Sequence, residues 1–287
     1  MEELTPEKII QVLNESSYLG MLKWRPGSEG LICKTTHTAE IEYRDGNTET
    51  SFVKIFASKI ELFNEVIGYL IAKAIGLPVA NEAAVIKIPS ETLKFAELES
   101  NTANLYEWAW AVSEVPGVSP KVHFKFRNSI GLTKALIKDV QKWSDLHGTV
   151  AFDDFVFNTD RNLENFLRIG KSKYVLIDHG NLLGGKPIWA INDLFSLLRQ
   201  STFNLYGLCH NKLSAIAWDN NIPDCDQQKV LDSCMKHDFT VRTYSSEIEF
   251  WCGALLSLNQ KKHFNRFISF RAKNGPSRVK SVFGMLL

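Results

Sequence analysis

Residues 158–165 have the sequence Asn-Thr-Asp-Arg-Asn-Leu-Glu-Asn, and residues 177–180 have the sequence Ile-Asp-His-Gly. Asp160 precedes Asn165 by five residues, and Asp178 follows Asn165 by thirteen, at the end of a short apolar run. This spacing suits phosphoryl transfer, in which one acid accepts the proton of an attacking hydroxyl while an amide and a second acid hold Mg²⁺ against the phosphates of ATP. The two segments therefore predict a site for ATP, Mg²⁺ and a hydroxyl acceptor.

The residues of this stretch also have simpler explanations. Asp160 could have no role beyond capping a turn, because Asp and Asn side chains hydrogen-bond the nearby backbone in loops. Arg161 could pair with a nearby acid and brace the loop, or it could neutralise phosphate. Of the two acids one turn earlier, at 153 and 154, we expect Asp154 to brace the loop by hydrogen bonds.

A lysine lies at the centre of the sequence Phe-Val-Lys-Ile-Phe at residues 52–56, and Glu65 follows Lys54 by eleven residues. Residues 59–75 carry apolar side chains at helical spacing, which predicts an amphipathic helix that includes Glu65. A strand lysine held by a helix acid and reaching the ATP phosphates is the arrangement of kinases. The alternatives are an outward-facing lysine and a solvated glutamate.

The rest of the pattern predicts strands first and helices later. A short helix is expected from Thr5 to about Leu13, followed by strands at 31–34, 39–43, 51–56, 83–88 and 108–112. Pro-Gly-Val-Ser-Pro at 116–120 is the strongest break. Helices at 129–141 and 145–157, strands at 166–169 and 174–177, and several C-terminal helices follow it. We predict an α+β chain with a strand-rich N-lobe at 1–115, a hinge at 116–120 and a mostly helical C-lobe at 121–287.

Residues 35–38, Thr-Thr-His-Thr, join the first two predicted strands. In kinases the corresponding turn covers the ATP phosphates and is usually rich in glycine, which lets backbone N–H groups approach them. This turn contains no glycine, so we expect the hydroxyls of Thr35, Thr36 and Thr38 to contact the phosphates. An ordinary polar hairpin turn explains the same residues.

The composition indicates a globular protein without a strongly charged partner. The net charge is +1, apolar residues make up 45% and charged residues 23%, which gives no strong signal for nucleic acid. No segment has the ~18 uninterrupted apolar residues of a membrane span, and the N-terminus lacks the pattern of a signal peptide. Five widely spaced cysteines fit a reducing cytoplasm, so we expect a cytoplasmic protein.

Three other features have no clear catalytic role. Cys234 and His237 have helical spacing, but a zinc site needs four convergent ligands. Residues 261–271 alternate aromatic or aliphatic with basic side chains, which predicts a helix packed on the C-lobe with Arg266 and Arg271 on a solvated face. The alternative is a basic face that docks a partner. His179 is expected to pack and hydrogen-bond rather than to act as a base.

Together these motifs resemble the HipA-like kinases, a bacterial branch near the phosphatidylinositol 3/4-kinases within the protein-kinase-like superfamily. The resemblance covers about residues 53–181. It is carried by Val-Lys-Ile at 53–55, Asn-Glu at 64–65, Gly-Leu-Pro-Val at 76–79, Asp154, the stretch at 158–165 and Ile-Asp-His at 177–179. The order Asp-Arg at 160–161 distinguishes this branch from ordinary eukaryotic-type kinases. The first thirty residues are too few for the extra N-terminal domain of full-length HipA toxins.

The resemblance implies a two-lobed protein-kinase-like fold and a catalytic role for each matched residue. Lys54 would contact the ATP phosphates, and Glu65 would orient Lys54. Asp160 would be the catalytic base. Asn165 and Asp178 would be the Mg²⁺ ligands.

The resemblance also implies supporting residues. Asn158, Arg161 and Asp154 would support the catalytic loop. The strand before the hinge, near Val112 to Glu114, would offer backbone groups to adenine. Serines of the phosphate loop are autophosphorylated in related toxins, and the threonines at 35, 36 and 38 are the corresponding candidates.

Three functions are compatible with this pattern. The first is a serine/threonine kinase that uses ATP and Mg²⁺ on a protein substrate, with a small antitoxin-like or regulatory partner. The second is a catalytically weak kinase-fold binding module that acts through a protein partner. The third keeps the fold but transfers AMP, or phosphorylates a lipid or a small molecule.

Overall fold

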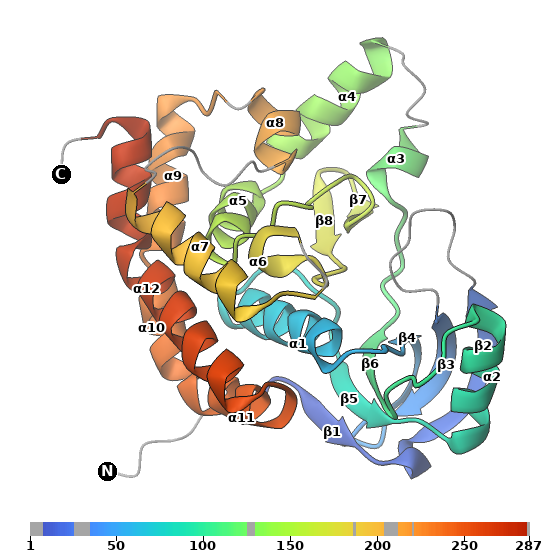
Figure 1. Ribbon diagram of the computed structural model, residues 1–287. Helices are drawn as coiled ribbons and strands as arrows, with labels where there is room; N and C mark the ends of the chain where they lie inside the picture. The colour runs from blue at the N-terminus through green and yellow to red at the C-terminus, as the bar shows by residue number, and fades with distance from the viewer. Residues whose placement is uncertain are drawn as a thin grey trace.

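The computed structural model describes residues 8–25, 35–124, 130–185, 188–203, 212–219 and 221–285. These residues form a six-stranded sheet, a two-stranded hairpin and many helices, so the predicted α+β class is confirmed (Figure 1). The strands are β1 Gln11–Leu13, β2 Tyr18–Arg25, β3 Thr36–Glu42, β4 Thr48–Lys54, β5 Ala83–Lys87, β6 Trp108–Ser113, β7 Phe166–Gly170 and β8 Lys173–Leu176. The helices are η1 Glu15–Ser17, α1 Lys59–Ala74, α2 Ser90–Ser100, α3 Pro120–His123, α4 Ile130–Gln141, α5 Leu146–Phe155, α6 Leu182–Gly185, α7 Ile191–Phe203, α8 Lys212–Trp218, α9 Asp224–Cys234, α10 His237–Thr243, α11 Ser245–Leu255 and α12 Leu258–Phe283.

The six-stranded sheet has the order β1-β5-β6-β4-β3-β2. Strand β1 runs parallel to β5, and the other neighbours are antiparallel. Lys54, the last residue of β4, pairs with Thr36 on β3 and with Trp110 on β6. The lysine therefore extends from an interior strand, whose backbone is fixed on both sides.

The N-terminal prediction is wrong where it can be compared. Residues 11–13 form β1 rather than the end of a helix, because Val12 pairs with Val85 on β5. Residues 1–7, with the predicted helix start at Thr5, and the predicted strand at 31–34 lie outside the described residues. Strand β2 and helix α2 were not predicted.

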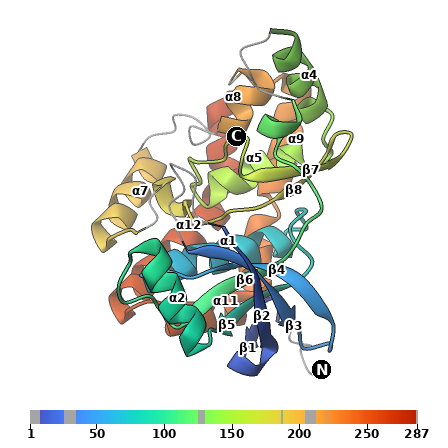
Figure 2. The same ribbon diagram turned by 90° about the vertical axis from the view of Figure 1, so that its right-hand side faces the viewer.

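Helix α1 was expected to be amphipathic, but it is buried on nearly every side. Ser58 accepts a hydrogen bond from Ile60 N at its start, and Gly76 has φ +83° just after its end, where glycine is the usual residue. Every residue from Leu62 to Ala72 is buried, because α1 packs between the sheet and helices α10 and α11 (Figures 1 and 2). One hydrophobic core therefore continues across the predicted boundary at 116–120.

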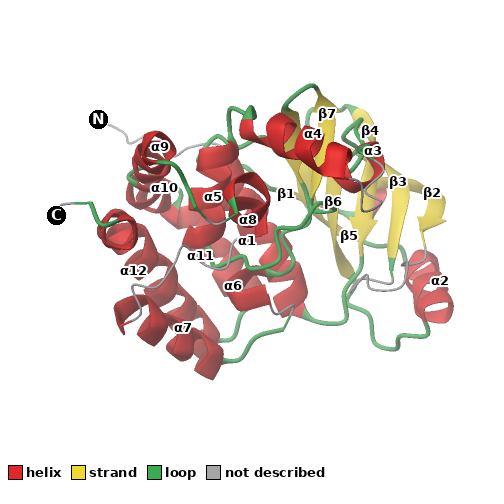
Figure 3. Cartoon of the chain, turned by 90° about the horizontal axis from the view of Figure 1, so that it is seen from above, coloured by secondary structure: helices red, strands yellow, loops and turns green. Residues whose placement is uncertain are grey.

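The chain changes from strand-rich to helix-rich near that boundary, and Figure 3 shows most helices on one side of the six-stranded sheet. Helices α4 and α5 and strands β7 and β8 match the predicted elements to within a few residues. Helix α12 buries Phe264, Phe267 and Ile268 as expected, but Arg271 is only 3% exposed, so its predicted solvated position is wrong. Within the described ranges, none of the helices combines the length and apolar character needed to cross a bilayer.

Candidate active site

Lys54 places its ammonium group between two carboxylates. Its Nζ lies 2.6 Å from Glu65 Oε1 and 3.3 Å from Asp178 Oδ1. The lysine comes from β4, Glu65 from the buried part of α1, and Asp178 from the segment after β8. The structure thus brings together three predicted site residues that are distant along the chain.

Glu65 also holds the backbone next to Asp178. Its second oxygen, Oε2, accepts a hydrogen bond of 2.9 Å from the backbone N–H of His179. The side chain is 3% exposed, which rules out a solvated glutamate. Burial raises the pKa of Glu65, and the ammonium of Lys54 acts against this rise. Glu65 therefore connects α1 to both the lysine and the segment after β8.

Asp178 has the left-handed backbone conformation, with φ +57°. Aspartate tolerates this region better than most residues do. Its carboxylate is 38% exposed, in contrast to that of Glu65. Burial acts to raise the pKa of Asp178, but the Lys54 ammonium and local hydrogen bonds lower it to about 2. The side chain is therefore ionised at neutral pH and accessible to a cation.

His179 is a packing residue, as predicted, but it does not hydrogen-bond through its ring. Its ring packs edge-on against Phe152, with centroids 5.9 Å apart. Both ring nitrogens are buried and have no hydrogen-bond partner within the described part of the chain. Burial and the positive charge of Arg161 lower the pKa of His179 well below its usual value, so the imidazole is neutral.

Gly68 of α1 allows the close approach of this histidine. A Cβ atom at Gly68 would lie 2.5 Å from the Cβ atom of His179. We expect Gly68→Ala to lower the free energy of unfolding by about 1–3 kcal/mol through overpacking, measured by chemical denaturation. The matched control is Gly253→Ala on α11, where the nearest atom to a Cβ is Lys261 Nζ at 3.9 Å. The control should stabilise by about 0.5–1 kcal/mol, as usual for Gly to Ala in a helix; equal effects of the two variants would contradict the prediction.

Asp160 lies in a network of polar contacts that includes Asn165, one of the two predicted metal ligands. Its Oδ2 accepts a hydrogen bond of 2.8 Å from Asn181 Nδ2, and its Oδ1 lies 2.9 Å from Lys212 Nζ. Its backbone oxygen accepts one of 3.0 Å from Asn165 Nδ2, and its N–H donates to Asn158 Oδ1 at 3.0 Å. Asn181 is three residues after Asp178, so Asp160 is held by the same segment that carries the acid beside Lys54.

The loop at 158–165 is braced by Asp153, not by Asp154 as predicted. Arg161 donates from Nε and Nη2 to Asp153 Oδ1, at 3.1 Å each, and both side chains are fully buried. Its Nη1 donates to the backbone oxygens of Asn165 and Ile177, at 3.0 and 3.1 Å. Of the two interpretations of Arg161, bracing the loop is therefore the one that its position supports.

Asp154 faces a different side of α5, toward α12. It pairs with two arginines of α12, Arg278 and Arg271, the latter with Nη2 3.5 Å from Asp154 Oδ1. Arg271 also donates from Nε to the backbone oxygen of Phe155 at 2.8 Å, and from Nη2 to that of Asp154. Helix α12 thus satisfies carbonyl groups at the C-terminal end of α5, just before the loop at 158–165.

The predicted phosphate turn is wrong. Residues 36–38 lie in β3, and Thr36 pairs with Arg25 and Lys54. The hydroxyl of Thr35 donates to the backbone oxygen of Ile55 rather than facing a ligand. The segment that connects β2 to β3 is 26–35, which contains Gly27 and Gly30, and its residues 26–34 lie outside the described part of the chain.

The predicted adenine contacts at Val112 and Glu114 are also not supported. Val112 pairs with Phe52 on one side and Ala83 on the other, because β6 is an interior strand. The N–H of Glu114 donates to the backbone oxygen of Thr50 at 2.8 Å. A hollow of about 510 Å³ lies beside Glu114 and the start of the predicted hinge. It is lined by Glu49, Thr50, Glu114, Val115, Pro116 and Gly117.

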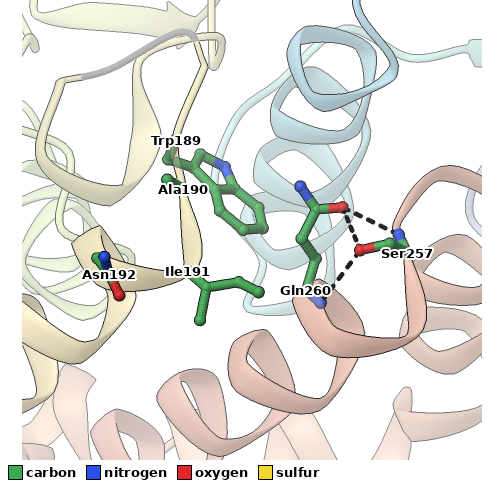
Figure 4. A pocket seen from close by; sticks show the side chains of 6 residues that line it. All are labelled: Trp189, Ala190, Ile191, Asn192, Ser257 and Gln260. Atoms are coloured by element: carbon green, nitrogen blue, oxygen red, sulfur yellow. Dashed lines mark hydrogen bonds between the residues drawn. The ribbon is translucent and has the colours of Figure 1, made fainter.

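Asn64 and Trp189 support the segment after Asp178 and were not predicted as site residues. Asn64 Nδ2 donates to the backbone oxygen of Gly180 at 2.8 Å, and Trp189 Nε1 donates to Asn64 Oδ1 at 2.9 Å. Trp189 also borders a hollow of about 420 Å³, whose other lining residues are Ala190, Ile191, Asn192, Ser257 and Gln260 (Figure 4). Ser257 and Gln260 bind each other there, and no predicted catalytic side chain lines the hollow.

The oxygen donors near Asp160 fit Mg²⁺ better than zinc. Among the described residues, no three or more His, Cys, Asp or Glu side chains form a metal-holding group, Cys234 and His237 included. Mg²⁺ usually binds one or two carboxylates together with substrate phosphates and water. Asp178 and Asn165 supply donors of this type, and Asn181 Oδ1 is a buried oxygen with no hydrogen-bond partner in the described ranges. The side chains thus suit Mg²⁺ held jointly with a phosphate.

No family model matches this chain, and no curated protein matches it. One solved structure, that of the open conformation of CtTel1, is similar over 87% of this chain, with 10% sequence identity and a TM-score of 0.37. The similar part makes up 11% of the CtTel1 chain. A likeness this weak supports no conclusion about fold family or function.

Proposed function

We propose that this chain is a HipA-like kinase with a two-lobed fold, which transfers the γ-phosphoryl group of ATP to a Ser or Thr of a protein. One observation carries the proposal: Lys54 Nζ lies between Glu65 and Asp178, while Asn181, three residues after Asp178, holds Asp160. A cation, an accessible acid and a second acid beside it are the side chains that phosphoryl transfer requires.

Each side chain has a distinct role in this mechanism. Lys54 contacts the phosphates that remain on the nucleotide, and Glu65 keeps its ammonium in place. Asp178 and Asn165 present oxygen atoms to Mg²⁺, which when bound neutralises charge on the phosphates. Asp160 accepts the proton of the attacking hydroxyl, and Asn181 fixes the orientation of its carboxylate.

The transfer step forms one phosphorus–oxygen bond, breaks another and moves one proton. The acceptor oxygen forms a bond to the γ-phosphorus, and the bond from that phosphorus to the β,γ-bridging oxygen breaks. ADP leaves with the electron pair of the broken bond, and the hydroxyl proton moves to the Asp160 carboxylate. Positioning and charge stabilisation thus account for most of the catalysis.

Binding of ATP tests the nucleotide part of the proposal. We expect Lys54→Met to weaken ATP binding about 10- to 100-fold, because it removes a charged hydrogen bond to phosphate. Removal of Mg²⁺ with a chelator should weaken binding to a similar extent. Titration calorimetry measures both effects. The matched control is Lys87→Met, a strand lysine 3.6 Å from Glu107 on the surface, which should bind like the wild type; equal affinities of all three proteins would refute the proposed nucleotide site.

The acceptor and the transferred group are tested by intact mass. Phosphoryl and adenylyl groups differ greatly in mass, so the mass gained by a labelled protein distinguishes a kinase from an AMP transferase. A catalytically weak binding module is the alternative, and it would bind a partner without transferring label. A turn without glycine and the basic helix at 261–271 favour such a module. Those threonines lie in or beside β3, and Arg271 of the helix is buried, so the kinase is the stronger candidate.

A further inference from the structure

A second lysine, far from Lys54 in sequence, contacts the proposed base. Lys212 is the first residue of α8, and its Nζ lies 2.9 Å from Asp160 Oδ1. The side chains of Lys212 and Asp160 are 52% and 29% exposed. The pair therefore lies at the surface of the site, where a substrate can reach both groups.

The two oxygens of the Asp160 carboxylate have different partners. Oδ2 is held by the amide of Asn181, a side chain fixed in the segment after Asp178. Oδ1 is held by Lys212, whose ammonium is carried on a flexible four-carbon stem. An incoming hydroxyl needs one carboxylate oxygen as its acceptor. Lys212 can release that oxygen by rotation of its long stem, whereas Asn181 has a short side chain whose Oδ1 is buried.

The charge on the transferred group calls for a cation on this side of the site. In the transition state, negative charge spreads over the three equatorial oxygens of the γ-phosphoryl group. Lys54 lies within 3.3 Å of two carboxylates and is assigned to the phosphates that stay on ADP. Lys212 is next to the base that the acceptor hydroxyl must approach. It is therefore also next to the phosphoryl group while that group is being transferred.

We propose that Lys212 is a catalytic residue that moves from Asp160 to the transferred phosphoryl group. This inference rests on the proposed kinase function. The ammonium stays protonated throughout and forms no covalent bond; it donates hydrogen bonds to the equatorial oxygens while the phosphorus–oxygen bonds are exchanged. Asp160 Oδ1 becomes free to accept the proton of the acceptor at the same moment.

The test uses the full chain with Mg·ATP as the probe and water as the acceptor, and measures release of inorganic phosphate. We expect Lys212→Met to lower kcat about 10- to 1,000-fold, the range for loss of one donor to transition-state charge. The KM for ATP should change less than about threefold, because Lys54 still binds the other phosphates. Lys212→Arg should restore most of kcat. The matched control is Lys229→Met, a 58% exposed lysine 2.8 Å from Asp226, which should keep the wild-type kcat.

The outcomes separate this inference from the proposed function. Loss of kcat in Lys212→Met with recovery in Lys212→Arg supports the inference. An unchanged or higher kcat in Lys212→Met, or an equal loss in both variants, overturns it while Asp160→Asn still abolishes phosphate release. If Asp160→Asn also releases phosphate at the wild-type rate, the proposed function itself fails.

Discussion

Asp160→Asn is expected to reduce phosphoryl transfer by about two to four decades, the usual effect of losing a positioned general base. The amide has nearly the shape of the carboxylate but cannot accept the proton of the acceptor hydroxyl. The backbone contacts of residue 160 with Asn158 and Asn165 do not depend on its side chain, so the loop should keep its conformation. The measurement is incorporation of label from γ-labelled ATP into lysate proteins with Mg²⁺ present.

Two controls make this result specific. ATP affinity of Asp160→Asn should stay within about threefold of the wild type, since the proposed mechanism gives Asp160 a contact with the acceptor hydroxyl and none with the phosphates of ATP. Asp238→Asn removes a surface acid that pairs with Arg242 at 2.8 Å, and it should leave the rate unchanged. Transfer by Asp160→Asn at the wild-type rate would exclude Asp160 as the base.

The parts of the site that sequence predicts well are those fixed by short spacings. Lys54 ends β4 and Glu65 lies in α1, the next element, with only residues 55–58 between the two elements. The local pattern is therefore enough to bring the two side chains together. Asp160 and Asn165 lie in one loop whose contacts are also local. Asn181 is only three residues after Asp178, so this short spacing could have identified Asn181 as a further site residue.

Other parts depend on contacts that no local pattern contains. Strand β1 forms because it pairs with β5, about seventy residues later, and this pairing overrides the helix prediction at residues 11–13. Strand β2 lacks apolar alternation because it is an exposed edge strand. The sequence therefore predicted the turn before β3 at residues 35–38, whereas residues 36–38 belong to β3 itself. Nothing near Lys212 in the sequence indicates its contact with Asp160.

The choice between Asp153 and Asp154 shows the same limit at one position. Adjacent residues on a helix point about 100° apart, so only one can face the catalytic loop. Which one does so is decided by Arg271 and Arg278 of α12, more than a hundred residues later. The sequence could not show that α12 would supply two cations to that side of α5.

The second large effect is expected from Arg161→Met, which removes the guanidinium that faces the Asp153 carboxylate. Both side chains are 0% exposed, and removal of one partner from a buried ion pair typically costs about 3–5 kcal/mol. Loss of the bonds to the backbone oxygens of Asn165 and Ile177 adds to this cost. The free energy of unfolding, measured by denaturant titration, should fall by that amount. Arg242→Met, which breaks a pair whose arginine is 73% exposed, should cost about 0.5 kcal/mol or less.

A double variant separates the charge from the backbone contacts. In Asp153→Leu with Arg161→Met, both charges of this pair are gone, and replacement of a buried pair by apolar side chains is often close to neutral. The double variant should therefore be more stable than Arg161→Met alone, but it should not reach the wild type, because the two backbone oxygens still lose their donor. Its ATP affinity should also be reduced, since Asn165 and the segment before Asp178 are held by those same bonds. If Arg161→Met costs no more than Arg242→Met, the buried pair does not stabilise the catalytic loop.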